Sequence, residues 1–144
     1  MTSPTSHVPS RLRARIQAQA RYRCGYCLRH QDLLGMPLTI DHIIPQVAGG
    51  QTIEENLWLA CHRCNRNKSA QTHALDPETG ERIGLFNPRQ QILSEHFKWN
   101  QDGTHILGTT PCGRATVIAL NLNNAEIVLA PQRWVSVGWW PPQD

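Results

Sequence analysis

Two pairs of cysteines with the same spacing are the residues of this sequence that most directly indicate chemistry. Cys24 and Cys27 form one Cys-x-x-Cys pair, and Cys61 and Cys64 form the other. Two such pairs supply four thiolates for tetrahedral Zn²⁺, and four protein ligands leave no open position for a substrate. Redox activity is the alternative, but two pairs without a flanking βαβ pattern favour zinc. We therefore expect a structural zinc site, with the unpaired Cys112 as a small core residue.

The residues between and after the cysteine pairs predict the order strand, strand, helix. Residues 38–44 form a short run rich in β-branched side chains, which is typical of a strand. Residues 56–59 resemble a second short strand, and a helix is expected over about 62–72. Between the strands, Thr52 and Glu55 have the spacing of a capping box for a single helical turn. Zinc would join the two ends of this strand–strand–helix unit.

Several motifs occur in an order and spacing that resemble the HNH endonuclease motif, a ββα-metal fold. The residues that carry the resemblance are Cys24, Cys27, Asp41, His42, Ile43, Ile44, Pro45, Gly49, Gly50, Asn56, Leu57, Trp58, Leu59, Ala60, Cys61, Cys64, Asn65 and Lys68. The match extends over about residues 20–72. An isolated Asp-His pair would mean little, whereas the joint occurrence of these motifs is specific. The expected fold class is α+β, with an HNH core held by a structural zinc.

The resemblance implies a role for each polar residue of the motif. His42 would be the general base, because a neutral imidazole accepts a proton from water at cellular pH. Asp41 and Asn65 would hold one catalytic ion, and their hard oxygen atoms suit Mg²⁺ or Mn²⁺. Asn56 would bind the backbone of the loop and hold His42 in place. Lys68 matches a position near the scissile group and is expected to contact phosphate.

Two of these residues have open alternatives. Asn65 stands where many family members have the third histidine of the motif, which makes a softer catalytic ion such as Ni²⁺ or Zn²⁺ less expected. Asn56 is also compatible with an ordinary turn residue before a strand. The family reaction, hydrolysis of a phosphodiester bond to 5′-phosphate and 3′-hydroxyl ends, cuts one strand per encounter. Double-strand cleavage would then need a homodimer or two successive events.

Positive charge is concentrated at the start of the chain, although the net charge is only +3. Six arginines precede the first acidic residue, Asp32. They are Arg11, Arg13, Arg15, Arg21, Arg23 and Arg29. A polyanion such as DNA could bind there, and RNA is an open alternative. Arg21, Arg23, Arg63 and Arg66 are the candidates for nucleic-acid contact, and a solvated helix face is the other interpretation.

The chain divides, by its composition, near residue 75. We expect a core domain over residues 1–75, including a basic N-terminal helix from Ser10 to about Tyr22. Residues 76–144 are expected to form a small mixed extension packed on the core. It would begin with a linker or long loop, because breaker residues are frequent over 75–88.

The predicted extension contains a hairpin and helices. Residues 96–99 and 104–107 flank a turn-rich segment and predict the hairpin. A helix is expected over 113–120, and a second one after Asn123 or Asn124 that is interrupted or kinked near Pro131. Three C-terminal tryptophans are expected to pack in a core rather than stack on bases. They are Trp134, Trp139 and Trp140.

Three classes of function remain after the sequence analysis. No apolar run is long enough for a membrane span, and residues 1–10 lack the apolar stretch of a signal peptide, so we expect a cytoplasmic protein without a membrane partner. The leading hypothesis is a metal-dependent DNA endonuclease. A non-catalytic, zinc-dependent nucleic-acid-binding module is the alternative, and a protein-interaction zinc domain is the third class.

Overall fold

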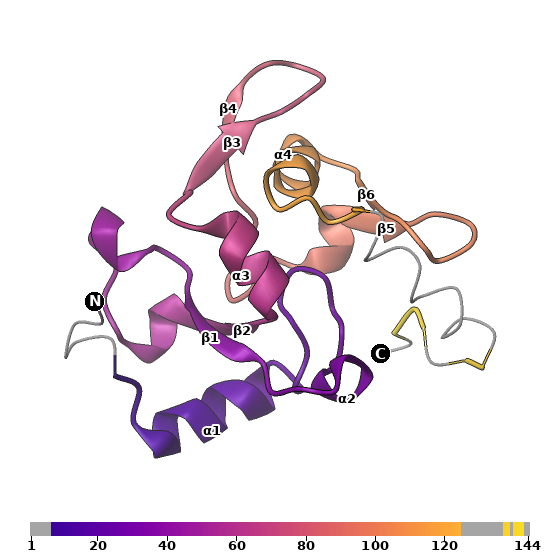
Figure 1. Ribbon diagram of the computed structural model, residues 1–144. Coiled ribbons are helices and arrows are strands. Elements are labelled where there is room, and N and C mark those ends of the chain that lie inside the picture. Colours follow the sequence, from indigo (N-terminus) through magenta and orange to yellow (C-terminus); the bar gives the residue numbers. More distant parts are fainter. Residues whose placement is uncertain (1–6, 125–136, 139, 143–144) are drawn as a thin grey trace. The chain divides into compact units, whose positions relative to one another are not determined.

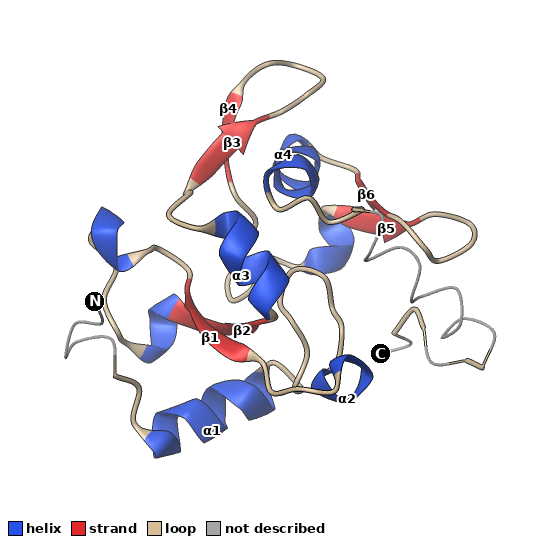
Figure 2. Ribbon diagram, in the orientation of Figure 1, coloured by secondary structure: helices blue, strands red, loops and turns tan. Residues whose placement is uncertain are grey.

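The structure is a computed structural model that describes residues 7–124, 137–138 and 140–142 (Figure 1). The chain divides into two compact units. The first unit consists of Met1–Thr72 and Asn87–Gln90, and the second consists of His73–Phe86 and Gln91–Asp144. Short antiparallel strand pairs and helices make up both units (Figure 2), which places the chain in the α+β class. No helix of the described residues is long and apolar enough to cross a membrane.

The first unit begins with helix α1, Ser10–Gln19. Ser10 does not cap this helix, because Pro9 occupies the N-cap position and makes no side-chain cap hydrogen bond. The helix also ends before the predicted Tyr22. Arg21 and Tyr22 have φ angles of 54° and 58°, in the left-handed region, so the α-helical hydrogen-bond pattern cannot continue through them.

A ββα arrangement forms the centre of the first unit, as predicted. Strand β1, Thr39–His42, pairs antiparallel with strand β2, Leu57–Ala60. In this register Asp41 lies opposite Trp58, and His42 lies opposite Leu57. Helix α3, His62–Lys68, follows β2 directly and packs against β1 (Figure 1). The helix α2, Gln31–Leu34, lies between the first cysteine pair and β1.

A small apolar cluster joins α1 to the strand pair. Ile16 of α1 and Leu57 of β2 are fully buried, and Val8 lies against them. Leu12 and Ile40 pack at the margin of this cluster. Leu12, Ile16 and the buried Ala20 recur every four residues and therefore share one helical face. Burial of this face stabilises the attachment of the basic helix to the core.

The expected capping box between the strands is absent from the described loop. A single 3₁₀ turn, Glu54–Asn56, does occur there. Its N-cap residue is Ile53, however, and no side chain caps it. Thr52 precedes this N-cap position by one residue, and its hydroxyl oxygen lies 2.9 Å from Nε2 of His42. A second 3₁₀ turn, Gln46–Ala48, lies earlier in the same loop.

The described residues of the second unit form two hairpins and one helix of nine residues. Strand β3, His73–Leu75, pairs with β4, Arg82–Gly84, in the region where the sequence predicted a linker or long loop. The one hairpin that the sequence predicted, from residues 96–99 and 104–107, is confirmed. Strand β5, Phe97–Trp99, pairs with β6, Ile106–Gly108. A 3₁₀ turn, Leu93–Glu95, precedes β5.

Helix α4, Pro111–Ala119, contacts both hairpins of the second unit and begins two residues before the predicted start. Thr110 caps it by accepting a hydrogen bond from the Gly113 amide at 3.1 Å. Trp140 is buried and packs edge-on against Trp99 at a ring separation of 4.9 Å. The predicted helix after Asn124, together with Trp134 and Trp139, lies outside the described residues.

A buried ion pair organises the tip of the first hairpin in this unit. Asp76 is fully buried, and its two carboxylate oxygens accept hydrogen bonds from Nε and Nη2 of Arg114, each at 2.9 Å. The Glu78 amide and the Thr79 hydroxyl also donate to this carboxylate. Sequence reasoning missed this hairpin because breaker residues lie at its tip, and its carboxylate is bound by an arginine 38 positions away.

We predict that Asp76 makes the second unit sensitive to acid. The Arg114 guanidinium, with the Glu78 amide and Thr79 hydroxyl, holds the pKa of Asp76 well below its usual range. The folded state therefore binds fewer protons than the unfolded chain, whose aspartates have a pKa of about 3.9. Stability from this group is present above about pH 4 and is lost as the pH falls through the lower folded pKa.

Chemical unfolding of wild type and Asp76→Asn between pH 2 and 7 checks this prediction. The variant is expected to be less stable at pH 7 and to lose less stability on acidification than wild type. If the free energy of unfolding changed with pH in the same way in both proteins, the prediction would be contradicted.

Candidate functional site

The four paired cysteines converge in the first unit. Their sulfur atoms all lie within 4.8 Å of one another, and Sγ of Cys27 is 3.7 Å from Sγ of Cys61. All four side chains are buried free thiols. Cys61 is the N-cap residue of α3 and Cys64 lies in its first turn, so the helix start fixes one pair. Four sulfur donors at these separations fit a tetrahedral zinc ion.

Backbone amides surround the sulfur atoms. The amides of Tyr26 and Cys27 donate to Sγ of Cys24 at 3.4 and 3.5 Å, and the Cys64 amide donates to Sγ of Cys61 at 3.4 Å. Burial raises the pKa of Cys24, whereas hydrogen bonds from the neighbouring thiols, Cys24 first, lower the pKa of Cys61. A divalent ion would favour the thiolate form of the whole set, because ligating thiols are deprotonated.

His42, the predicted general base, lies at the end of β1 and is half-buried. Its Nε2 atom is 2.9 Å from Oγ1 of Thr52. Within the described part of the chain, no hydrogen bond involves its other ring nitrogen, Nδ1. Burial lowers the pKa of His42, which favours the neutral form of the ring. In the tautomer whose Nε2–H donates to the Thr52 hydroxyl, the lone pair of Nδ1 is able to accept a proton.

Sequence reasoning missed this contact of Thr52. The residue lies ten positions after His42, on the far side of the β1–β2 loop. Its spacing from Glu55 suggested a helix cap, which is a local role, whereas the actual partner is brought close only by the fold of the loop. A threonine at this place in the loop carries no sequence signal of its own.

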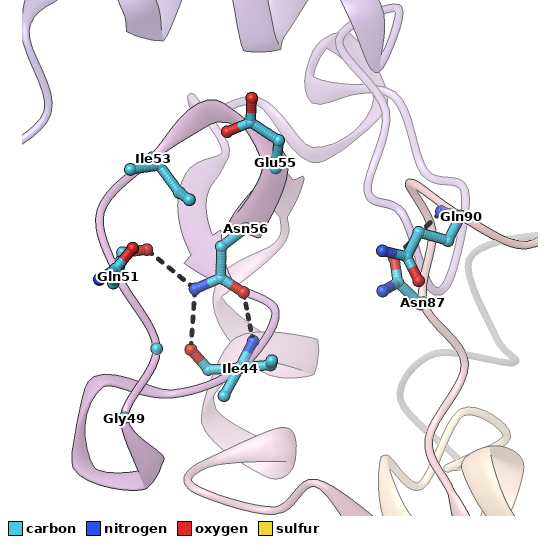
Figure 3. Close-up of a pocket in the computed structure, with 9 residues that line it drawn as sticks. Ile44, Gly49, Gln51, Ile53, Glu55, Asn56, Asn87 and Gln90 are labelled. Carbon is cyan, nitrogen blue, oxygen red and sulfur yellow. Dashed lines mark hydrogen bonds between the residues drawn. The ribbon is translucent and has the colours of Figure 1, made fainter.

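Asn56 bridges the two sides of that loop (Figure 3). Its Oδ1 accepts from the Ile44 amide at 2.8 Å, and its Nδ2 donates to the carbonyls of Ile44 at 3.0 Å and Gln51 at 2.9 Å. Gly50 fits beneath this bridge because a Cβ there would overlap the Ile44 carbonyl and crowd Nδ2 of Asn56. The amide therefore fixes the backbone two residues after His42.

An open cleft of about 300 Å³ borders this loop. Residues between 44 and 56 line one part of it, and Asn87 and Gln90 line another (Figure 3). Its lining includes no lysine or arginine, so it does not offer a cationic site for a phosphate group.

Asp41 is enclosed in the first unit together with Tyr26 and Lys68. The Tyr26 hydroxyl donates to Oδ2 of Asp41 at 2.8 Å, and the Lys68 ammonium lies 3.3 Å from Oδ1. The ammonium also donates to the His42 carbonyl at 2.9 Å. Burial raises the pKa of Asp41, and Lys68 opposes that shift. Lys68 was expected to contact phosphate, but its side chain is only 2% exposed.

The remaining candidate residues lie on the same unit. Asn65 is half-buried on α3, and its side chain makes no hydrogen bond within the described residues. Arg66 on α3 is exposed, whereas Arg63 is half-buried. Arg21 is exposed in the turn after α1. Arg23, half-buried, forms an isolated bridge with His30.

Arg89 is a further residue of this unit that the sequence did not indicate. Its Nε and Nη2 donate to the Leu57 carbonyl at 3.2 and 3.0 Å, and its guanidinium lies 4.9 Å from the ring centroid of Trp58. Nη2 also donates to Gln19 of α1 at 2.7 Å. Arg89 thus ties a distant segment of the chain to the strand opposite Asp41 and His42.

A family model described as HNH endonuclease matches residues 24–71. This range contains both cysteine pairs, β1, β2 and α3. Neither the curated proteins nor the solved structures gave a match.

We predict that the purified protein contains one zinc ion per chain and that Cys61→Ser loses it. Structural zinc contributes on the order of 10 kcal/mol to the folding of small domains, which is comparable to the whole stability of a typical domain. The variant is therefore expected to unfold in its first unit. Cys112→Ser, which lies outside the cluster, is the matched control and should keep its zinc. Elemental analysis with thermal unfolding tests this, and equal zinc contents in the two variants would contradict it.

Proposed function

We propose that the protein is a metal-dependent endonuclease that hydrolyses DNA phosphodiester bonds, and the match of residues 24–71 to the HNH endonuclease family model supports this. The observation that carries the proposal is the environment of His42. Burial favours its neutral form, Nε2 lies 2.9 Å from the Thr52 hydroxyl and would donate to it, and Nδ1 makes no hydrogen bond within the described residues. Such a group can take a proton from the attacking water.

Asn56 supports this role of His42. A general base must be held within hydrogen-bond reach of the water, and a displacement of about 1 Å can cost roughly a hundredfold in rate. The Asn56 amide makes three hydrogen bonds to the backbone of the loop that follows His42. It thereby restricts the motion of the strand end that carries the imidazole.

Asp41 and Asn65 are the proposed ligands of the catalytic ion. Each oxygen of Asp41 accepts one hydrogen bond and retains a second lone pair, and the Asn65 amide has no partner within the described residues. A carboxylate and an amide oxygen suit Mg²⁺ or Mn²⁺, which would stabilise negative charge developing on the phosphate. The chain itself supplies the ligand atoms, the base and the groups that orient them.

Arginines are the proposed contacts to the nucleic-acid backbone. Arg66 of α3 and Arg21 after α1 are exposed, and Arg63 and Arg23 are partly so. Guanidinium groups bind phosphate oxygens with two parallel hydrogen bonds, which positions a duplex without reading its sequence. DNA is the proposed substrate, with RNA as the alternative polyanion. One such centre cuts one strand, so double-strand cleavage would need a homodimer or a second event.

We predict that His42→Ala abolishes divalent-ion-dependent nicking of supercoiled plasmid. Loss of a general base costs roughly 10²- to 10⁴-fold in rate. His62→Ala, an exposed histidine in the same unit, is the matched control and should nick like wild type. Both variants must retain zinc. DNA binding by wild type without nicking under Mg²⁺ or Mn²⁺ would favour the non-catalytic binding module instead.

Thr52→Val tests the orientation of the imidazole. The substitution preserves shape and removes the hydroxyl, and loss of one such hydrogen bond costs about 0.5–1.5 kcal/mol. If the loss of this hydrogen bond raises the activation free energy of cleavage by that amount, we expect the nicking rate to drop roughly 2- to 10-fold with DNA affinity unchanged. Thr109→Val, an exposed threonine of the second unit, provides the control. A wild-type rate for Thr52→Val would show that the Thr52 contact is dispensable.

A further inference from the structure

Lys68 is an unusual lysine because its charged end lies inside the protein. It is the last residue of α3, and only 2% of its side chain is exposed. The ammonium donates to the carbonyl oxygen of His42 at 2.9 Å and lies 3.3 Å from Oδ1 of Asp41. Helix α3 is thereby tied to the two adjacent residues at the end of β1.

The carboxylate of Asp41 is held from its other side by the cysteine cluster. Tyr26 lies between Cys24 and Cys27, is 1% exposed, and donates its hydroxyl to Oδ2 of Asp41 at 2.8 Å. Each oxygen of Asp41 therefore has its own donor, one from the first cysteine pair and one from the end of α3. Position and orientation of this side chain are determined by two elements far apart in the sequence.

The charges explain why the lysine stays inside. A buried ammonium or carboxylate without a partner is strongly unfavourable, so each of Lys68 and Asp41 requires the other. When no divalent ion is bound, turning Lys68 outward to reach a phosphate would leave the Asp41 carboxylate, 4% exposed, without its counter-ion. It would also break the hydrogen bond to the His42 backbone. Exposed arginines such as Arg66 can reach phosphate without either loss.

We propose that Lys68 is a positioning residue: it fixes Asp41 and the backbone of His42 from within the first unit and makes no contact with phosphate. Tyr26 completes the arrangement by coupling the zinc-binding cysteines to the same carboxylate. What Lys68 positions is the base of the proposed function, so the assignment rests on that function. The buried ion pair itself is independent of it.

The first experiment separates positioning from phosphate contact. Affinity for a labelled DNA duplex is measured over a salt series, without added divalent ions, for wild type, Lys68→Met and Arg66→Gln. Each lost phosphate contact reduces the slope of log K against log salt by about 0.9. We expect Lys68→Met to keep the wild-type slope. A slope reduced by about 0.9 would overturn the proposal. Arg66→Gln makes the same change in net charge at a proposed phosphate contact of α3, so it is the positive control and is expected to show the reduced slope.

The second experiment measures the rate of the folded variant. At a temperature well below its unfolding transition, Lys68→Met is expected to nick under single-turnover conditions at least tenfold more slowly than wild type, with unchanged DNA affinity. A lysine that only stabilised the fold would leave this rate unaltered, so a wild-type rate would overturn the positioning role. Tyr26→Phe, which removes only the hydroxyl, is the milder variant should Lys68→Met not fold. It is expected to lower the same rate while keeping its zinc.

Thermal unfolding tests the buried pair without any nucleic acid. Lys68→Met is expected to lower the Tm, and adding Asp41→Asn to that variant is expected to raise the Tm again, because no charge is then left unpaired. If the two substitutions lowered the Tm by the sum of their separate effects, the proposed ion pair would be overturned. If the wild-type protein neither bound nor cut DNA, the proposed function would be wrong. The Tm values would still show whether Lys68 and Asp41 form a buried ion pair.

Discussion

The convergence of four cysteine sulfurs within 4.8 Å is the constraint on which the first unit depends. One pair lies in the turn before α2, and the other starts α3, so a bound zinc would join segments that enclose both strands. The apolar cluster around Ile16 and Leu57 is small, and a core of that size gives limited stability. A metal that binds only the folded state adds its binding energy to folding and compensates for the small core.

This constraint extends beyond the cysteines to the candidate active site. Tyr26 connects the first cysteine pair to Asp41, and Lys68 connects the end of α3 to Asp41 and His42. The proposed base therefore lies on a strand end fixed by the elements that would hold the zinc. Asn56 and Thr52 hold the loop on the other side of His42. A site built this way is ordered before substrate binds, which reduces the cost of reaching the reactive geometry.

The second unit is held together by a buried ion pair. Its central polar contact is the bidentate ion pair of Asp76 with Arg114, which holds the β3–β4 hairpin against α4. Phe86 packs edge-on against Phe97, and its amide donates to the Thr116 hydroxyl at 2.9 Å. Buried polar pairs of this kind favour one arrangement of short elements, because any other arrangement leaves a charge without a partner.

Residue types and their spacing determined the local features of this protein. The two Cys-x-x-Cys pairs, the β-branched run around Ile40 and the hairpin near Trp99 are short-range patterns, and each predicted an element that the structure contains. The direction in which a side chain points was decided only by the tertiary structure. Lys68 is buried because Asp41 and the His42 carbonyl lie beside it after folding, 27 and 26 residues away in sequence. Spacing along a chain encodes local geometry, whereas the burial of a charge depends on which distant group the fold brings within hydrogen-bond distance.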